Sequence, residues 1–579
     1  MLMGISTLVA LATLLYLTRQ TSFWADEWLW ITGRRANTIG TFLRPFNEHL
    51  SLVPIAIYRV MFAVFGLRHY APYRALAIAG HLACALLVFS YVRARLGGLI
   101  ALLAGILILF LGPGWQDMLW GFQIAWSIAL AAGIGALLLL DRDGGRSDIA
   151  ACVLIGVSLA STSVGIAIAL GIAVDVALTR RRWADAWIVA IPLALYAIWA
   201  LIYHPGDLVA SGVLTVPSYL ARAAAAALSG LVGLSGLNPL NETGQTLEFG
   251  VPLALALVAT TGWLIHRRGL GARAVSLTVM LVVYWALVPL GRVVFSQPGN
   301  SRYIYVSCIL ALLLVVELAR DVVLARAQAA ENGDGEVGGA VELAPGVRLS
   351  GVSIIAVLLI GAAALLSNIG ILRAGAGYLR SQGRATNADL AALNLVRGNL
   401  PPGYIPTSLP LSIFNPFTAQ SYFAAERTLG TPAYSTVQLV RADPNTRATA
   451  DRELEHAREI AAGAPQPELR IAGAPARVET TSAGRVRISG SCLTFEPSSV
   501  TPTQGTPYIL LAVPPTGVRV STSQSTATFS VRRFGASFAQ LGALGPGQAA
   551  DVTIHPDAAP ESWLLQVAAP TATRICTLA

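Results

Sequence analysis

Residues 1–30 read MLMGISTLVALATLLYLTRQTSFWADEWLW, and this stretch decides the fold class. Residues 1–18 carry no charged side chain, and an apolar run of about 17–25 residues is long enough to cross a bilayer. Directly behind this run, Asp26 and Glu27 lie among aromatic residues that include Trp24 and Trp28. Carboxylates at the bilayer edge are costly to desolvate, and proton-abstracting chemistry needs such groups. The stretch therefore predicts a membrane protein with a functional acidic pair beside its first span.

The composition of the whole chain agrees with a membrane protein. Of the 579 residues, 55% are hydrophobic and 12% are charged, with a mean hydropathy of +0.62. Soluble domains carry about 25% charged residues. The net charge of +9 comes from arginine alone, because the sequence contains no lysine. These arginines recur in short loops between apolar runs, as the positive-inside rule expects, so we do not infer nucleic-acid binding.

We expect an α-helical polytopic membrane protein with about 11 transmembrane helices. A helix over 149–178 would be about 45 Å long, too long for a hydrocarbon core of about 30 Å, so a break at Ser161, Thr162 and Ser163 should give two short helices. The run 50–66 either spans the membrane or lies along its interface. The predicted spans are 2–18, 75–92, 97–112, 122–140, 149–161, 163–178, 186–203, 247–265, 274–291, 303–319 and 351–371.

The distribution of arginines predicts the orientation. With 50–66 outside the membrane, one side collects Arg93, Arg95, Arg142, Arg146, Arg180, Arg181, Arg182, Arg267, Arg268, Arg273, Arg320, Arg326 and Arg348. The other side collects mainly Arg222, Arg292 and Arg302. The first side is then cytoplasmic, and the loop 19–74 with Asp26 lies outside. That loop also carries Arg34, Arg35, Arg44, Arg59 and Arg68, an excess that we interpret as a sign of anionic ligands nearby.

The chain changes character after residue 372. We predict a transmembrane domain over 1–372, a mixed helical connector over 373–465 and an extracytoplasmic β-sandwich over 466–579, with a flexible linker at 327–346. The connector should contain helices at 387–400 and 448–462. Short alternating runs predict strands at 485–488, 508–511, 518–521, 528–531 and 564–567.

Cys492 and Cys576 are expected to form a disulfide in this C-terminal region. Closing a loop of about 84 residues would stabilise the fold by about 4–5 kcal/mol on the chain-entropy model. Such a bond requires an oxidising compartment, which agrees with the outer side that the arginines indicate. We therefore expect a multi-pass protein of the plasma membrane whose C-terminal domain lies outside the cytoplasm.

Two acidic motifs in the first outer loop are candidates for chemistry. Asp26 and Glu27 are adjacent, so on a helix they point about 100° apart and cannot share one proton. One of them acts while the other orients or binds, or both cap a helix over 28–37. Glu48 and His49 form a second polar cluster that would face the first across a pocket. Alternatively, Asn47 caps the helix at 50–66 with Glu48 in its first turn.

Further candidates lie at the ends of later spans. Asp117 lies in the polar segment 112–123 and is either a catalytic acid or an acid at a helix N-terminus. Arg292 and Arg302, the latter followed by Tyr303, suit the phosphate of a lipid because guanidinium binds phosphate in a bidentate manner. The alternative is ordinary anchoring to lipid headgroups.

Several common catalytic motifs are excluded or weak. A DxD motif, the usual signal of a metal and nucleotide-sugar site, occurs at residues 141–143. It falls on the predicted cytoplasmic side, in a loop beside Arg146, so we do not expect it to be catalytic. A Walker A motif needs lysine, and the sequence contains neither HExxH nor GxSxG. No CxxC or Cys/His spacing of a metal site is present either.

This layout resembles the GT-C glycosyltransferase superfamily, and most closely its protein-mannosyltransferase and aminoarabinose-transferase type. The resemblance covers about residues 1–372. It lies in the apolar first helix, the Asp26–Glu27 pair in a long outer loop, the acid in the second outer loop, the run 47–49 and the run 301–303. The C-terminal β region is similar in placement to the carbohydrate-binding domains of arabinosyltransferases.

The resemblance implies an inverting transfer from a polyprenyl-phosphate-linked sugar to an acceptor hydroxyl outside the membrane. Asp26 would then be the base, Glu27, Glu48 and His49 would orient the acceptor, and Asp117 would position the sugar. Arg292 and Arg302 would stabilise the leaving phosphate. Some members use a divalent metal, Mg²⁺ or Mn²⁺, held by DxD-like acids; because no DxD lies outside here, we expect catalysis without a metal. The acceptor is a glycan, a protein or a lipid.

Other classes of protein remain as alternatives. A transporter or flippase of a lipid-linked glycan should show repeated halves and charges near the membrane midplane, whereas the charges here lie at the outer edge. A non-catalytic envelope scaffold would bind glycan through the β domain. An enzyme using nucleotide sugars on the cytoplasmic face would depend on Asp141.

Overall fold

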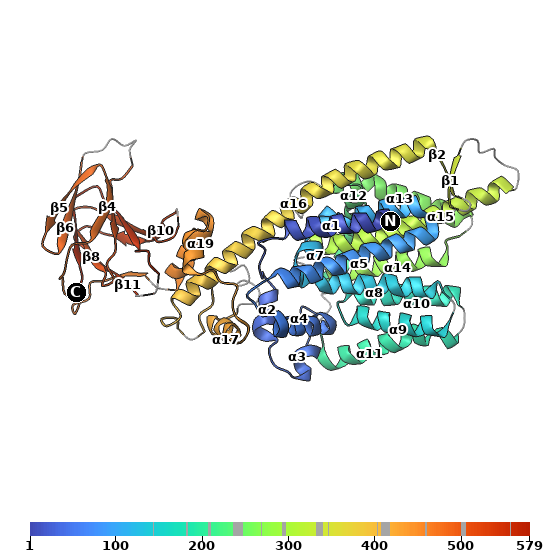
Figure 1. Cartoon of the computed structure of the whole chain (residues 1–579), viewed down its shortest axis with the longest axis horizontal. Helices are drawn as coiled ribbons and strands as arrows, with labels where there is room; N and C mark the ends of the chain where they lie inside the picture. Colours follow the sequence, from blue (N-terminus) through green and yellow to red (C-terminus); the bar gives the residue numbers. More distant parts are fainter. Residues whose placement is uncertain are drawn as a thin grey trace. The chain divides into compact units, whose positions relative to one another are not determined.

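The computed structural model describes the chain apart from residues 143, 181–182, 207–209, 236–246, 268, 292–296, 332–339, 345–346, 402, 407–416, 458–459, 499–504, 536, 556 and 558. The described chain divides into two compact units (Figure 1). The helical unit contains Met1–Thr21, Arg34–Phe65 and Tyr70–Arg380. The C-terminal unit contains Ser381–Ala579 together with two early segments, Ser22–Gly33 and Gly66–His69.

The helical unit is a bundle of apolar helices. They are α1 (Leu2–Leu17), α3 (Ile39–Leu43), α4 (Leu52–Phe65), α5 (Ala71–Leu96), α6 (Gly98–Leu109), α7 (Trp115–Leu119), α8 (Ile124–Leu140), α9 (Gly145–Leu159), α10 (Val164–Thr179), α11 (Trp187–Tyr203), α12 (Ala210–Leu231), α13 (Leu247–Arg267), α14 (Ala272–Gly291), α15 (Ser301–Glu331) and the first part of α16 (Gly351–Leu395). The 3-10 turns η1 (Gly112–Gly114), η2 (Gly121–Gln123) and η3 (Trp183–Asp185) and the hairpin β1 (Ala340–Ala344) and β2 (Val347–Ser350) complete it.

Several of these helices are long and apolar enough to cross a membrane. Among the described residues, five satisfy this by length and composition, or six if the bent pair Gly98–Leu109 and Gly112–Leu119 counts as one span. Leu2–Leu17, Val164–Thr179 and Trp187–Tyr203 are shorter apolar helices. The protein is therefore a multi-pass membrane protein. Helix α4, with 14 residues, is about 21 Å long, which is less than a hydrocarbon core of about 30 Å.

The predicted break near residue 161 is confirmed. Helix α9 ends at Leu159 and α10 begins at Val164. Asp148 in the first turn of α9 accepts a hydrogen bond from Arg180, just beyond the end of α10, at 3.0 Å. Because the start of one helix meets the end of the next, the two helices are antiparallel, as the sequence predicts.

A network of charged side chains links several helices at one end of the bundle. Arg95 of α5 pairs with Glu317 of α15 and, at 3.0 Å, with Asp141 beyond α8. Arg273 of α14 pairs with Asp141 and, again at 3.0 Å, with Asp175 of α10. Because each buried charge has an opposite partner, the network can exist in a low-dielectric interior. Several arginines that the sequence analysis assigns to one side thus lie at one end of the bundle.

The C-terminal unit contains two antiparallel sheets (Figure 1). The five-stranded sheet has the order β10 (Ala539–Leu544), β9 (Ala527–Arg532), β12 (Leu564–Ala568), β7 (Tyr508–Ala512) and β4 (Arg477–Ser482). The six-stranded sheet has the order β3 (Ile460–Gly463), β11 (Ala549–Ile554), β8 (Val518–Thr522), β13 (Thr573–Thr577), β6 (Cys492–Pro497) and β5 (Gly484–Ser489). All five strands that the alternating runs predict are present.

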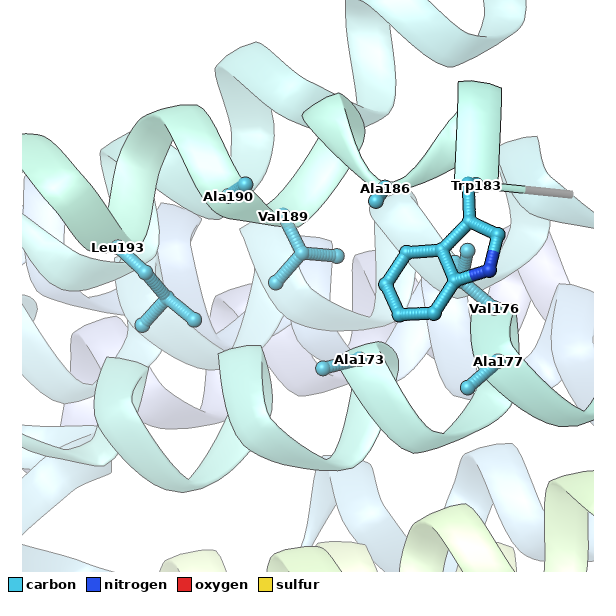
Figure 2. A pocket seen from close by; sticks show the side chains of 8 residues that line it. All are labelled: Ala173, Val176, Ala177, Trp183, Ala186, Val189, Ala190 and Leu193. Carbon is cyan, nitrogen blue, oxygen red and sulfur yellow. The ribbon is translucent and has the colours of Figure 1, made fainter.

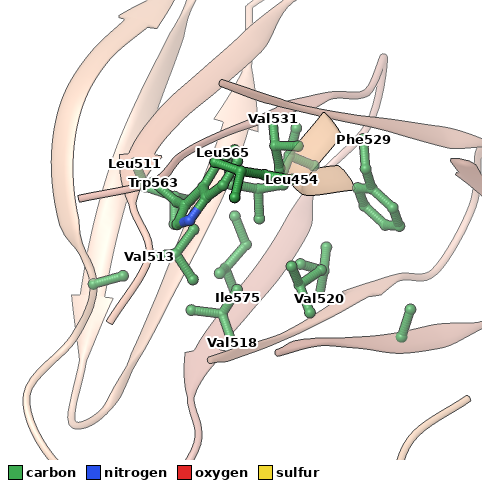
Figure 3. Packing of buried hydrophobic residues seen from close by; sticks show 14 of the residues in the cluster. Leu454, Leu511, Val513, Val518, Val520, Phe529, Val531, Trp563, Leu565 and Ile575 are labelled. Carbon is green, nitrogen blue, oxygen red and sulfur yellow. The ribbon is translucent and has the colours of Figure 1, made fainter. Parts of the chain in front are cut away.

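One hydrophobic core joins both sheets. Leu511, Val531 and Leu565 come from the five-stranded sheet, and Val520 and Ile575 from the six-stranded sheet (Figure 3). Helix α19 (Pro444–His456) contributes Leu454 to the same core, and the end of α16 adds alanines such as Ala392. A disulfide joins Cys492 and Cys576, which lie opposite each other on β6 and β13.

Three predictions about local structure are wrong in part. The helix expected over 448–462 ends at His456, because Ile460–Gly463 pairs with β11 as strand β3. The helix expected over 387–400 is the end of the 45-residue α16, which stops at Leu395. The linker expected over 327–346 begins as the last turns of α15 and contains strand β1, which pairs with β2. Long-range pairing and helix continuation override local propensity in these places.

Candidate functional site

The segment 112–123 is buried along its whole length and interrupts the bundle between α6 and α8. A proline flanked by glycines, Gly112-Pro113-Gly114, ends the apolar run and introduces a bend of 41°. Gly112 is required there, because a Cβ atom would lie 2.3 Å from the carbonyl oxygen of Asn368 on α16. The helix predicted over 97–112 is therefore followed, after this bend, by the short buried helix α7.

Hydrogen bonds to neighbouring helices fix this segment. The backbone N–H of Gln116 donates to Oγ of Ser301 at 3.0 Å, and that of Gly121 donates to the hydroxyl of Tyr70 at 2.9 Å. These residues begin α15 and precede α5, respectively. The starts of α15 and α5 thus meet at the segment that carries Asp117.

Asp117 is fully buried, and neither of its carboxylate oxygens has a hydrogen-bond partner on another described residue. The positive charge of Arg302 acts on it. The side-chain oxygen of Gln116 and both amide atoms of Gln123 and Asn368 are likewise buried without a partner among the described residues. Buried polar groups are normally hydrogen-bonded, to protein, to water or to a ligand. This cluster therefore suits a polar ligand with both donors and acceptors.

Arg302 and Tyr303 lie in the first turn of α15. The Nε atom of Arg302 is buried and has no partner among the residues that the structure describes. The Tyr303 ring packs edge-on against Trp126 with centroids 6.0 Å apart, and its carbonyl accepts a hydrogen bond from the Tyr284 hydroxyl at 3.2 Å. Arg292, the other predicted phosphate ligand, lies outside the described residues.

Glu48 and His49 reach the same end of the bundle. His49 Nδ1 lies 2.6 Å from Oγ of Ser163, and its ring packs edge-on against Trp126 at 6.4 Å. Glu48 has a positive φ of 69°. Its carboxylate lies close to Gly291, because a Cβ atom added to Gly291 would be 3.0 Å from Oε2 of Glu48. A positive φ at a non-glycine residue is strained and is concentrated at functional sites. Trp126 thus connects His49 to Tyr303.

The candidate site lies at the opposite end of the bundle from the charged network. From Ser301 to Glu317, α15 rises for sixteen residues, or about 24 Å. Asp141, the first acid of the DxD, belongs to the network through Arg95 and Arg273. The second acid, Asp143, lies outside the described residues. In the described part of the chain, no group of three or more His, Cys, Asp or Glu side chains has the arrangement of a metal site.

Asp26 and Glu27 lie in the C-terminal unit, in its segment Ser22–Gly33. Glu27 is fully buried and its Oε2 accepts a hydrogen bond from the backbone N–H of Trp24 at 3.0 Å. This contact closes the turn before α2 (Glu27–Gly33), in which Ala25 has a positive φ of 50°. Glu27 thus lies at the start of a helix, as the capping alternative expects, and its role in orienting the acceptor stays a prediction. Asp26, in the same turn, is partly buried. The predicted helix over 28–37 ends at Gly33.

Two of the five arginines that we interpreted as a sign of anionic ligands, Arg34 and Arg59, donate hydrogen bonds to backbone carbonyls. Arg34 donates to the carbonyls of Thr41 and Pro45 at 2.8 and 2.7 Å. Arg59 donates to the carbonyls of Arg34 and Arg35 at 3.1 and 2.7 Å. These two guanidiniums therefore bind the backbone of the loop itself, and the interpretation that anionic ligands lie nearby stays a prediction.

The sequence analysis missed Gln116, Gln123, Asn368 and His81. His81 is fully buried in α5, with Nδ1 at 2.9 Å from the Tyr305 hydroxyl. Asn368 and His81 are polar residues inside predicted spans, which is itself a signal of function in membrane proteins. The two glutamines lie in the segment around Asp117, and nothing in the sequence marks either of them individually as a site residue.

No protein-family model and no curated protein matches this chain. Among solved structures, the chain is similar to ArnT from Cupriavidus metallidurans bound to undecaprenyl phosphate, with 13% identity, a TM-score of 0.43, and coverage of 73% of this chain and 87% of that chain. It is also similar to the arabinofuranosyltransferase AftD from Mycobacteria, with 13% identity, a TM-score of 0.32, and coverage of 99% of this chain and 61% of that chain.

Proposed function

We propose that this protein is an inverting glycosyltransferase of the GT-C type. It moves a sugar from a polyprenyl-phosphate donor to an acceptor hydroxyl at the outer face of the plasma membrane, in the synthesis of envelope glycan or glycoprotein. The observation that carries the proposal is the buried cluster around Asp117 and Arg302 at one end of a membrane-spanning bundle.

The chemistry of this cluster fits a sugar joined to a phosphate. Sugar hydroxyls both donate and accept hydrogen bonds, as the unpartnered carboxylate of Asp117, the side-chain oxygen of Gln116 and the amide of Gln123 require. The guanidinium of Arg302 suits a phosphate oxygen. Fixed charges in such a water-poor setting act more strongly than in water. A lipid-linked donor would bring the phosphate to this depth with its prenyl chain in the bilayer.

In the proposed reaction, the acceptor oxygen forms a bond to the anomeric carbon while the bond from that carbon to the phosphate oxygen breaks. The electron pair of the broken bond leaves with the polyprenyl phosphate, and Arg302, together with Arg292, stabilises its charge. The acceptor proton goes to a carboxylate base, for which we propose Asp26. A single displacement inverts the configuration, through an oxocarbenium-like transition state. Glu27, Glu48 and His49 orient the acceptor, Asp117 holds the sugar, and no step runs through a metal.

Two finer features complete the proposal. We propose about 11 spans in all, because the shorter apolar helices add to those that qualify by length. We also propose that the two sheets of the C-terminal unit form a β-sandwich that binds glycan outside the cytoplasm.

The test uses the full-length chain in proteoliposomes with a panel of polyprenyl-phosphate sugars and a mixture of envelope acceptors. Mass spectrometry quantifies the polyprenyl phosphate that is released. We expect Asp26→Asn to lower release by about 10²-fold or more, the range of general acid–base groups. Asp117→Asn should lower release by about 10- to 150-fold, the effect of losing a hydrogen bond to a charged group. Asp185→Asn, at the far end of the bundle, is the matched control and should retain activity. Gel filtration and thermal unfolding check that each variant is folded.

The outcomes separate the roles. Full activity of folded Asp117→Asn removes the buried cluster from the mechanism, and full activity of Asp26→Asn removes the proposed base. If the wild-type chain moves the lipid-linked sugar across the bilayer without releasing polyprenyl phosphate, the protein is a flippase instead of an enzyme.

A further inference from the structure

One cavity of the helical unit is unsuited to a sugar or a phosphate. It is an apolar groove between α10 and α11, and no described side chain in its lining is charged (Figure 2). Sugars and phosphates need hydrogen-bonding or charged partners. Polar side chains are buried elsewhere in the unit, and among them is His81, which is fully buried in α5 and reaches Tyr305 of α15. These two residues have no part in the proposed contacts with the sugar or the phosphate.

His81 lies next to a carbonyl that the bend at Pro113 deprives of its helical donor. In an α-helix the carbonyl of Leu109 would accept from the N–H of residue 113, and proline has none. Nε2 of His81 lies 3.3 Å from this carbonyl oxygen. Because a carbonyl oxygen only accepts, Nε2 carries the proton, and Nδ1 of the neutral imidazole accepts from the Tyr305 hydroxyl at 2.9 Å.

Tyr305 connects this histidine to the two charged groups of the candidate site. It follows Arg302 by three residues, about one turn of α15, so the two are neighbours on the helix surface. Its ring packs on the backbone of Gly114, because a Cβ atom added there would lie 2.6 Å from Cδ2 of Tyr305. Gly114 directly precedes α7, which carries Asp117, and the charge of Asp117 acts on the Tyr305 hydroxyl.

We propose that His81 and Tyr305 are positioning residues that set the distance between Asp117 and Arg302. His81 contacts Tyr305 through one ring nitrogen and the end of α6 through the other, so it holds α15 and the bend before α7 in one arrangement. The inference rests on the proposed function, in which Asp117 holds the sugar and Arg302 stabilises the leaving phosphate. Because both groups act on one donor molecule, an error in their separation lowers the rate of transfer more than the binding of the phosphate.

The test compares two chemically identical changes at opposite ends of the same pair of helices. Tyr305→Phe removes the hydroxyl that contacts His81. Tyr91→Phe, the matched control, removes a hydroxyl of α5 that donates to Glu317 of α15, ten residues or about 15 Å from His81 along α5. In proteoliposomes, with release of polyprenyl phosphate as the readout, Tyr305→Phe should lower kcat about tenfold, the effect of one hydrogen bond. Tyr91→Phe should retain the kcat of the wild type.

Two further variants test His81 itself. His81→Leu leaves the Leu109 carbonyl and the Tyr305 hydroxyl without this partner and should lower kcat by about 10²-fold, the effect of a misplacement of about 1 Å. His81→Gln should restore most of the activity, because its amide oxygen and nitrogen are separated by one carbon atom, as Nδ1 and Nε2 are, and can accept and donate in their place. The Kd of undecaprenyl phosphate should remain unchanged in all these variants.

The outcomes separate positioning from a general loss of stability. Equal kcat values for Tyr305→Phe and Tyr91→Phe would overturn the inference, and so would equal losses of kcat and of lipid binding in folded His81→Leu. A wild-type protein that releases no polyprenyl phosphate would instead contradict the proposed function. Hydrogen exchange then decides the inference without activity. Exchange in 112–123 should rise in Tyr305→Phe and stay at the wild-type level in Tyr91→Phe, and equal exchange in all three proteins would overturn it.

Discussion

At the scale of single residues, two predicted acids are equally buried but differ in their hydrogen-bond partners. Asp117 is fully buried with no partner on another described residue, whereas Glu27 is equally buried but closes the turn before α2 through Trp24. Both residue types and positions could be read from the sequence. The difference in their hydrogen bonding could not be predicted from the sequence. The surroundings of Asp117 depend on the packing of 112–123 against Ser301 and Asn368, which lie far along the chain.

Asp551 provides a prediction about pH. Its burial alone would raise the pKa, but the hydrogen bonds from Arg519 and from the backbone N–H of Gln466 outweigh this and lower the pKa of the carboxyl. A lowered pKa in the folded state gives stability that is present above the unfolded pKa of about 3.9 and is lost as the pH falls through the folded value. We expect the melting temperature of the C-terminal unit to fall below about pH 4.

The measurement is thermal unfolding of the full-length protein between pH 6 and pH 3. Asp551→Asn should flatten the dependence in this window. Glu496→Gln removes an exposed pair with Arg487 at 3.3 Å and serves as the control, because exposed ion pairs contribute little. An identical acid dependence in Asp551→Asn and the wild type would disprove this role for Asp551.

At the scale of elements, regular patterns were predictable and long-range interactions were not. The break between α9 and α10 and the five alternating strands follow from length and period, which are local properties. Strand β3 replaces the end of a predicted helix because Ile460–Gly463 pairs with β11, about ninety residues later. The candidate site also depends on long-range packing that the sequence does not reveal. Trp126 packs against both His49 and Tyr303, which are distant in the sequence.

The charged network leads to a prediction about the stability of the helical unit. Glu317 lies between Arg95 and the hydroxyl of Tyr91, both on α5. Glu317→Ala leaves Arg95 buried with Asp141 alone, and the loss of one partner of a buried pair costs about 3–5 kcal/mol. We expect a marked decrease in the melting temperature and in the yield of folded protein.

The compensating variant is Arg95→Met combined with Glu317→Met. Replacing both charges by apolar groups of similar size is often neutral, so the double variant should be more stable than Glu317→Ala. Thermal unfolding in detergent compares the three proteins. A double variant that is less stable than Glu317→Ala would show that the pair does more than neutralise its own charges.

At the scale of the whole molecule, the two units give separate tests. The Cys492–Cys576 disulfide closes a loop of 84 residues between β6 and β13. On the chain-entropy model, Cys492→Ser with Cys576→Ser should destabilise the C-terminal unit by about 4–5 kcal/mol. Hydrogen exchange of the full-length protein should rise in the strands of this unit and remain unchanged in the helical unit.

The same cysteines report on the side of the membrane. In intact cells, an oxidised pair should resist a maleimide until a reductant is added, as expected outside the cytoplasm. Cys152, which is partly exposed in α9, serves as the internal control for thiol labelling. A reduced and readily labelled Cys492–Cys576 pair in the cell would contradict the proposed orientation.

The central claim is that the Arg302 end of the helical bundle binds the phosphate of a polyprenyl lipid, and its most direct test is a binding measurement. The dissociation constant of undecaprenyl phosphate is measured for the reconstituted full-length protein. A hydrogen bond to a charged group contributes about 1.5–3 kcal/mol, so Arg302→Gln should weaken binding by about 10- to 150-fold. Arg222→Gln, which removes an exposed arginine of α12, should leave binding unchanged. Equal binding by the wild type and a folded Arg302→Gln protein would contradict the account.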